Sequence, residues 1–118
     1  METANFEKIK ETELYPFLDN DIKIGLAIYI HNEIEKRPVT LTFLKETFSE
    51  DLTFEEIVKG LNVLLTWELI ERTYEEVENG KVSMVYRLTD IGRNVFAKEY
   101  QDFSKKIKSP SIKPIPRS

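Results

Sequence analysis

The sequence predicts an α+β protein that is mostly helical, and three observations support this fold class. Residues 53–67 form a strongly amphipathic segment that begins with a helix-capping pattern. Residues 20–37 also repeat their apolar side chains at helical spacing. Between residues 68 and 88 the pattern changes to the alternation of strands around Asn79-Gly80, a dipeptide typical of hairpin turns. The framework is therefore two helices followed by a two-stranded hairpin.

Size and composition fit one soluble globular domain. The chain has 118 residues, of which 41% are hydrophobic and 32% charged, and it has no cysteine. Disulfides and thiolate metal sites are thereby excluded. The first ten residues are polar, and no stretch approaches the roughly 18 apolar residues of a membrane span. We expect a cytoplasmic protein with no membrane partner.

Charge is unevenly distributed along the chain. Residues 104–118 carry five basic side chains and no acidic one, a charge of +5, which leaves 17 − 5 = 12 basic against 21 acidic residues, or −9, for the rest. A basic tail is common in nucleic-acid-binding proteins, whereas an acidic body disfavours phosphate contact. The prolines and lysines of residues 104–118 predict a disordered tail.

The two N-terminal helices and the segment before them follow from local patterns. Residues 1–19 form an N-terminal segment that we expect to be helical and to offer a dimer contact. The helix of residues 20–37 has Asp19, Asn20 and Asp21 as N-cap candidates, and Pro38 ends it. A short second helix covers residues 42–48, with Leu44 and Phe48 facing inward.

The third helix has the clearest local pattern. Thr53 and Glu56 form a capping box, in which each side chain bonds the other residue's backbone N–H, and Leu52 and Ile57 occupy the hydrophobic-staple positions. One apolar stripe then runs to about Trp67 through Phe54, Ile57, Val58, Leu61, Leu64 and Leu65.

A two-residue turn at Asn79-Gly80 fixes the predicted register of the hairpin. In that register Arg72 lies opposite Arg87 on the outward face. The face toward the core then pairs Glu71 with Leu88, Thr73 with Tyr86, Glu75 with Met84 and Val77 with Val82. A last helix begins near Thr89 and carries the apolar residues Ile91, Val95, Phe96, Tyr100 and Phe103.

The segment Tyr86-Arg-Leu-Thr-Asp-Ile-Gly-Arg93 resembles the end of the wing and the start of the next helix in MarR-like and PadR-like transcriptional regulators. The order of elements over residues 20–103 agrees with that resemblance. It implies a winged helix-turn-helix domain with a two-stranded wing and extra terminal helices.

The residues offer little for catalysis or cofactor binding. His31 is the single histidine, and its mid-helix position predicts a packed, partly solvated side chain. A metal site needs several ligands at defined spacing, and a phosphate loop needs clustered glycines. We expect no enzyme, no cofactor and no metal.

The resemblance makes helix 53–67 the recognition helix for the major groove and the 68–88 hairpin a wing on the DNA backbone. The outward residues of the helix would contact bases: Lys59 on guanine or phosphate, Asn62 on adenine, Val63 on a thymine methyl, with Thr66 beside them. Arg72, Arg87 and Lys81 would hold backbone phosphates, since a phosphate would relieve the repulsion of two opposed arginines. A carboxylate such as Glu76 would relieve it equally.

Two functional classes remain open. One is a transcriptional regulator that binds double-stranded DNA as a homodimer, joined through the aromatic residues near both ends of the chain, although these residues could equally cover the domain's own base. The other is a winged-helix module whose acidic surface holds a basic protein partner without DNA. The wing, the basic tail and the resemblance favour the first; the −9 body favours the second.

Overall fold

We analysed a computed structural model, which describes residues 6–108. It is mostly helical with one two-stranded antiparallel sheet, as the sequence predicts. The elements in chain order are α1 (Phe6–Lys10), a 3-10 turn (Tyr15–Phe17), α2 (Asn20–Tyr29), a π-helical turn (Ile30–Ile34), α3 (Leu41–Thr47), α4 (Phe54–Thr66), β1 (Ile70–Glu76), a 3-10 turn (Glu78–Gly80), β2 (Val82–Leu88) and α5 (Asp90–Lys108).

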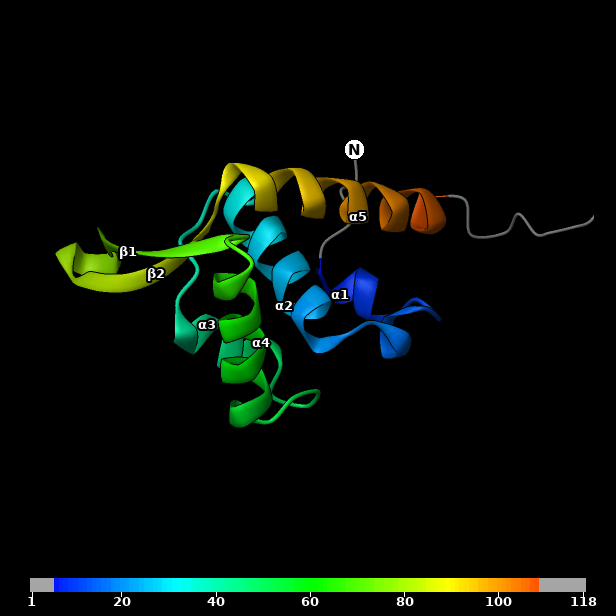
Figure 1. The fold of residues 1–118 in the computed structure, drawn as a ribbon, viewed down its shortest axis with the longest axis horizontal. Helices are drawn as coiled ribbons and strands as arrows, with labels where there is room; N and C mark the ends of the chain where they lie inside the picture. The colour runs from blue at the N-terminus through cyan, green and yellow to red at the C-terminus, as the bar shows by residue number, and fades with distance from the viewer. Residues whose placement is uncertain (1–5, 109–118) are drawn as a thin grey trace, which may run out of the picture.

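Helix α2 is the centre of the molecule. It packs against α4 on one side and α5 on another, while the hairpin projects beyond the helices (Figure 1). Helices α2 and α5 approach closely because Gly25 has no side chain: a Cβ there would lie 2.0 Å from the ring of Phe96. The core around this contact is continuous and includes Phe48, the C-cap residue of α3, and Leu64 from α4.

The N-terminal segment belongs to this core. Phe6, Ile9 and Tyr15 are buried, and the Phe6 ring packs edge-on against Tyr15 and Phe48. The predicted helical character of residues 1–19 is found only in α1 and the 3-10 turn, and residues 1–5 lie outside the described part of the chain. These aromatic side chains are therefore satisfied within one molecule, which removes most of the reason to expect them in a dimer contact.

Helices α3 and α4 each have a threonine as their N-cap residue. Thr53 accepts a hydrogen bond from the Glu56 N–H at 3.1 Å, and Glu56 Oε1 accepts one from the Thr53 N–H at 2.8 Å. The predicted capping box is thus confirmed, and α4 ends at Thr66 with Trp67 as its C-cap. Thr40 caps α3 in the same way by accepting from the Phe43 N–H.

Helix α2 ends before residue 37, the end that the sequence predicts. It continues as one π-helical turn to Ile34, and Lys36 takes a left-handed φ of 61°. The Asn32 side chain then donates to the carbonyl of Arg37 at 3.1 Å, which bridges the end of the turn. Pro38 disfavours helical geometry at Arg37, so the helix does not resume after Lys36.

The predicted hairpin register is wrong by one residue. Ile70 pairs with Leu88, Arg72 with Tyr86, and Glu71 with Arg87. The loop is three residues long, with Asn79 and Gly80 both at positive φ and the Val77 N–H bonded to the Lys81 carbonyl at 2.6 Å. This register turns the buried residues Ile70 and Leu88 to the same face, which a one-residue shift would prevent.

The segment at the end of β2 joins the hairpin to α5. The Thr89 hydroxyl accepts from the Gly92 N–H at 3.1 Å and donates to the Glu68 carbonyl at 2.6 Å. A Cβ on Gly92 would lie 1.9 Å from the Leu69 carbonyl oxygen, so only glycine fits this contact. Packing between the root of the hairpin and α5 therefore explains most of the residue pattern in the segment of residues 86–93.

Helix α5 extends further than the sequence predicts. Residues 104–108 are helical, so the predicted disordered tail is wrong for this part, and residues 109–118 lie outside the described chain. No proline lies between Pro38 and Pro110, so none interrupts α5. Among the described helices, none is long and apolar enough to cross a membrane.

Candidate nucleic-acid interface

The exposed face of α4 carries three of the four residues predicted to contact bases. Lys59, Asn62 and Thr66 are exposed and lie three or four residues apart, so they share one side of the helix. Their side chains make no hydrogen bond or ion pair with any other described residue. Val63 is half-buried at the edge of this face, so it is less accessible than its neighbours. The face is polar, uncommitted and presented by a well-capped helix.

Two glutamates stand at the start of the same helix. Glu56 is held by the Thr53 N–H, so its carboxylate is turned back to the helix end. Glu55 is exposed on the side of Lys59 and Asn62. A negative charge in the first helical turn is favourable for the helix, but it would repel a phosphate placed there.

Phe54 is not part of the buried stripe, contrary to the sequence prediction. It is 50% exposed, because it is the first residue of α4 and lies a turn before the buried Ile57. The ammonium group of Lys45 from α3 lies 5.3 Å from the centre of its ring, a cation–π contact. An exposed aromatic ring and a cation therefore stand together beside the α4 N-terminus.

The two faces of the hairpin differ in what they carry. One, the Tyr74 face, contains Ile70, Arg72, Tyr74, Glu76, Val82, Met84, Tyr86 and Leu88; the other, the Arg87 face, contains Glu71, Thr73, Glu75, Ser83, Val85 and Arg87. Near the helices the Tyr74 face enters the core through Ile70, Tyr86 and Leu88. Arg72 and Arg87 consequently point to opposite sides of the hairpin and are not neighbours.

Arg72 lies on the Tyr74 face and is exposed. Burial raises the pKa of the Tyr86 hydroxyl opposite it, and the charge of Arg72 acts in the other direction. The Arg72 guanidinium makes no hydrogen bond or ion pair within the described residues. It therefore remains a candidate for a phosphate.

Arg87 is already paired. Its Nε and Nη2 each donate to a carboxylate oxygen of Glu75 at 2.5 Å, and Thr73 donates to the same carboxylate at 2.9 Å. The hydrogen bonds from Arg87 hold the pKa of Glu75 below its usual value, and those to Glu75 raise the pKa of Arg87. Arg87 is therefore committed to Glu75 within the hairpin, and the predicted repulsion between Arg72 and Arg87 does not arise.

Lys81 is exposed at the tip of the hairpin, beside an open groove of about 930 Å³. The groove separates the hairpin tip from the start of α3. Its polar lining comes from His31, Arg37, Thr40, Thr42, Glu46, Glu76, Asn79 and Lys81. Arg37 and Lys81 thus stand at one depression, a juxtaposition that the spacing of 44 residues conceals in the sequence.

His31 has the packed, partly solvated environment that its position predicts. Its ring stacks on Phe43 at 3.7 Å between centres, and Nδ1 lies 2.8 Å from Glu35 Oε1. Within residues 6–108, no three histidine, aspartate or glutamate side chains are grouped so that they could hold a metal ion.

The sequence matches no protein-family model, and no curated protein matches it.

Proposed function

We propose that this protein is a winged helix-turn-helix regulator that binds double-stranded DNA. In this proposal α2, α3 and α4 form the helical part, α4 lies in the major groove, and the β1–β2 hairpin is the wing. The element order supports it, as does the short bridge between Val39 and Tyr86, which adds an extended residue beside the hairpin just before α3.

One observation carries the proposal. The exposed side of α4 presents Lys59, Asn62 and Thr66, which have no hydrogen-bond or ion-pair partner among the described residues. A cation, an amide and a hydroxyl at successive helical turns can donate to or accept from base edges in the major groove. Arg72 and Lys81 supply the phosphate contacts on the wing. Arg37, which lines the same groove as Lys81, supplies a third phosphate contact.

The proposal includes a homodimer, which would present two such helices to half-sites about one helical turn apart. Phe6 and Tyr15 of the N-terminal segment are buried in the core and so are not available for it, whereas Phe17 is exposed. The surface that remains on α5 is formed by Ile91 and Val95, which are exposed and one helical turn apart. We place the two-fold contact there.

Selection of bound sequences from random duplex DNA tests the function. We expect a preferred sequence whose affinity falls with salt by a slope of about −3, since three cations at about −0.9 each would be engaged. Asn62→Ala should reduce discrimination at one base pair by about 1–3 kcal/mol. Gln101→Ala removes an exposed amide from α5 and should change nothing. If no selected duplex binds even at low salt, DNA binding is rejected.

The second candidate is a protein-interaction module, and the acidic body favours it. Residues 1–103 carry a net charge of −9, and Glu46, Glu55, Glu71 and Glu76 are exposed on α3, α4 and β1. Such a surface would attract a basic partner, with association that slows as salt rises. A protein that binds no DNA but binds a basic peptide in a salt-dependent way would support this candidate.

A further inference from the structure

One edge of the hairpin is open beyond a single bridge. The Tyr86 N–H donates to the Val39 carbonyl at 2.8 Å, and this is the isolated bridge beside β2. An antiparallel partner strand would continue from Val39 along Met84 and Val82 toward the hairpin tip. The chain instead turns away and enters α3 at Leu41. The line of pairing that Val39 begins therefore stops after one residue.

The register of the hairpin shows which backbone groups are left without a partner. Directly opposed residues of an antiparallel pair alternate between bonded and non-bonded positions. The Val77 N–H donates to the Lys81 carbonyl, so Val82 and Met84 occupy non-bonded positions relative to β1. Their N–H and C=O groups consequently point to the outer edge of β2. Within the part of the chain that the structure describes, no backbone acceptor outside the hairpin bonds either N–H.

The two strands of the hairpin differ in charge. Four of the seven positions of β1 are charged: Glu71, Arg72, Glu75 and Glu76. Charged side chains on an edge strand are a usual protection against pairing with another chain. Residues 82–86 of β2 include no charged residue and no proline. An uncharged edge rich in β-branched and aromatic residues is the kind that accepts a further strand.

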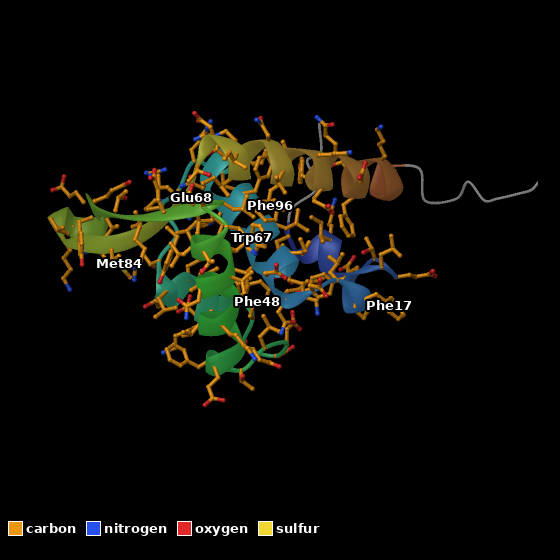
Figure 2. The ribbon with its side chains drawn as sticks, viewed as in Figure 1. Phe17, Phe48, Trp67, Glu68, Met84 and Phe96 are labelled. Atoms are coloured by element: carbon orange, nitrogen blue, oxygen red, sulfur yellow. The ribbon has the colours of Figure 1, made fainter. Side chains whose placement is uncertain are left out.

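The groove of about 930 Å³ lies where the missing strand would run. Its lining includes Pro38 and Thr40, on either side of Val39, and Lys81, which directly precedes Val82. The open stretch of β2 thus lies between two points of the groove wall, and Figure 2 shows Met84 on the part of the hairpin that projects beyond the helices. Because α3 forms the opposite wall, the groove suits a single extended segment better than the two strands of a second hairpin.

The side chains around this edge define the chemistry of the occupant. An added strand would place every second side chain on the Tyr74 face, beside Met84 and Val82, and Val82 is 69% exposed. Apolar residues at alternate positions would cover that exposed surface. The charged residues in the groove lining balance one another: Arg37, Lys81, Glu46 and Glu76. The groove therefore favours a segment without net charge.

We propose that the open edge of β2 binds an extended, uncharged peptide segment of a partner protein, antiparallel to β2 and with apolar side chains at alternate positions. In strand addition, backbone hydrogen bonds give affinity and alternate side chains give specificity. The apolar residues of the segment lie opposite Val82 and Met84, so their N–H groups are the ones that face β2. This inference goes beyond the proposed function and does not depend on DNA binding.

Fluorescence polarisation tests the inference on the full chain, with a labelled and capped octapeptide in which valine and threonine alternate. The wild-type protein should bind this peptide with a dissociation constant below about 1 mM. N-methylation of two valines removes N–H groups that face β2 and should weaken binding by about tenfold or more. N-methylation of two threonines adds the same methyl groups on the other edge of the peptide and should leave the dissociation constant unchanged.

A pair of protein variants tests the same contact from the other side. Val82→Pro removes one outward N–H and keeps the bonds to β1, since proline is tolerated at the start of an edge strand. It should weaken binding by about tenfold. Val82→Thr is the matched control, because it keeps the N–H and the shape of the side chain, and it should bind as the wild type does.

Three outcomes would overturn the inference. Equal losses from the two N-methylated peptides would mean that the peptide adheres to the apolar face without pairing with the edge. Failure to saturate at about 1 mM peptide would mean that the edge does not accept a strand. A wild-type dimer that Val82→Pro converts into a monomer would assign the edge to a second copy of the chain. No arm contains DNA, so none of these outcomes bears on the proposed function.

Discussion

Arg87 on β2 donates one hydrogen bond of 2.5 Å to each carboxylate oxygen of Glu75 on β1. The two residues are not directly opposite, because Glu75 pairs with Ser83 and Arg87 with Glu71. Their side chains therefore reach diagonally across the hairpin, past the pair formed by Thr73 and the buried Val85. Bidentate pairs of this kind are stronger and more specific in geometry than single ion pairs.

The first prediction concerns the stability of this pair and its dependence on pH. Because the pKa of Glu75 is lowered in the folded protein, the pair contributes stability above the unfolded value of 4.5, and this contribution is lost as the pH falls through the lower folded pKa. Glu75→Gln should therefore lower the unfolding free energy at pH 7. In acid, the difference in unfolding free energy between this variant and the wild type should become smaller. Thermal unfolding between pH 7 and pH 3 measures both. An unchanged gap at low pH would contradict the assignment.

The second prediction separates the two wing arginines. Arg72→Ala should weaken DNA binding to all sequences and flatten the salt slope by about one unit. Arg87→Ala should leave the slope unchanged and instead destabilise the free protein, because Glu75 loses its partner. Binding titrations at several salt concentrations and chemical denaturation distinguish them. A flatter slope in Arg87→Ala would restore that residue to the interface.

The third prediction concerns the cap of α4. Thr53→Ala should lower the unfolding free energy by about 0.5–2 kcal/mol, because the Glu56 N–H loses its acceptor. Thr42→Ala, an exposed threonine in α3 that caps nothing, should change it by less than about 0.5 kcal/mol. Urea unfolding monitored by circular dichroism provides the comparison, and equal effects would refute the capping role.

The fourth prediction concerns the root of the hairpin. Gly92→Ala should destabilise the protein by about 1–3 kcal/mol, since its methyl group would collide with the Leu69 carbonyl oxygen. Asn94→Ala places the same methyl group on an exposed position of α5 and should be close to neutral. Thermal denaturation of the two variants is the measurement. A neutral Gly92→Ala would mean that the two backbones separate without cost.

The fifth prediction concerns assembly. If α5 forms the two-fold contact, Val95→Asp should shift the protein from dimer to monomer, because it puts a charge in an apolar interface. Asn94→Asp introduces the same charge on the neighbouring residue and should have a smaller effect. Sedimentation equilibrium over a range of concentrations decides the matter. A wild-type protein that is monomeric at high concentration would exclude the dimer.

The local features of the fold were predictable from the sequence, because short-range chemistry determines them. The capping box of Thr53 and Glu56 depends on two residues three positions apart, and the structure has both of its hydrogen bonds. Asn79-Gly80 located the turn for the same reason. The sequence predicts too short an α5, because prolines after residue 108 do not indicate where the helix before them ends.

The candidate site was less predictable, because it depends on register and on contacts between distant segments. A loop one residue longer than expected moves every pair of the hairpin and separates Arg72 from Arg87. The partner of Arg87 follows from that single difference, because Arg87 and Glu75 share a face only in the observed register. The groove that joins Arg37 to Lys81 has no counterpart in any local pattern. The outward face of α4 was predictable because helical periodicity alone defines it.

The contact between Gly92 and Leu69 has a mechanical consequence. The α5 backbone at Gly92 contacts the Leu69 backbone just before β1, with no side chain between them. The Thr89 hydroxyl donates a hydrogen bond to the neighbouring Glu68 carbonyl. A rotation of α5 about its axis must therefore displace the base of the hairpin and move its tip by a larger distance. Whatever fixes the orientation of α5 also fixes the direction in which the hairpin points.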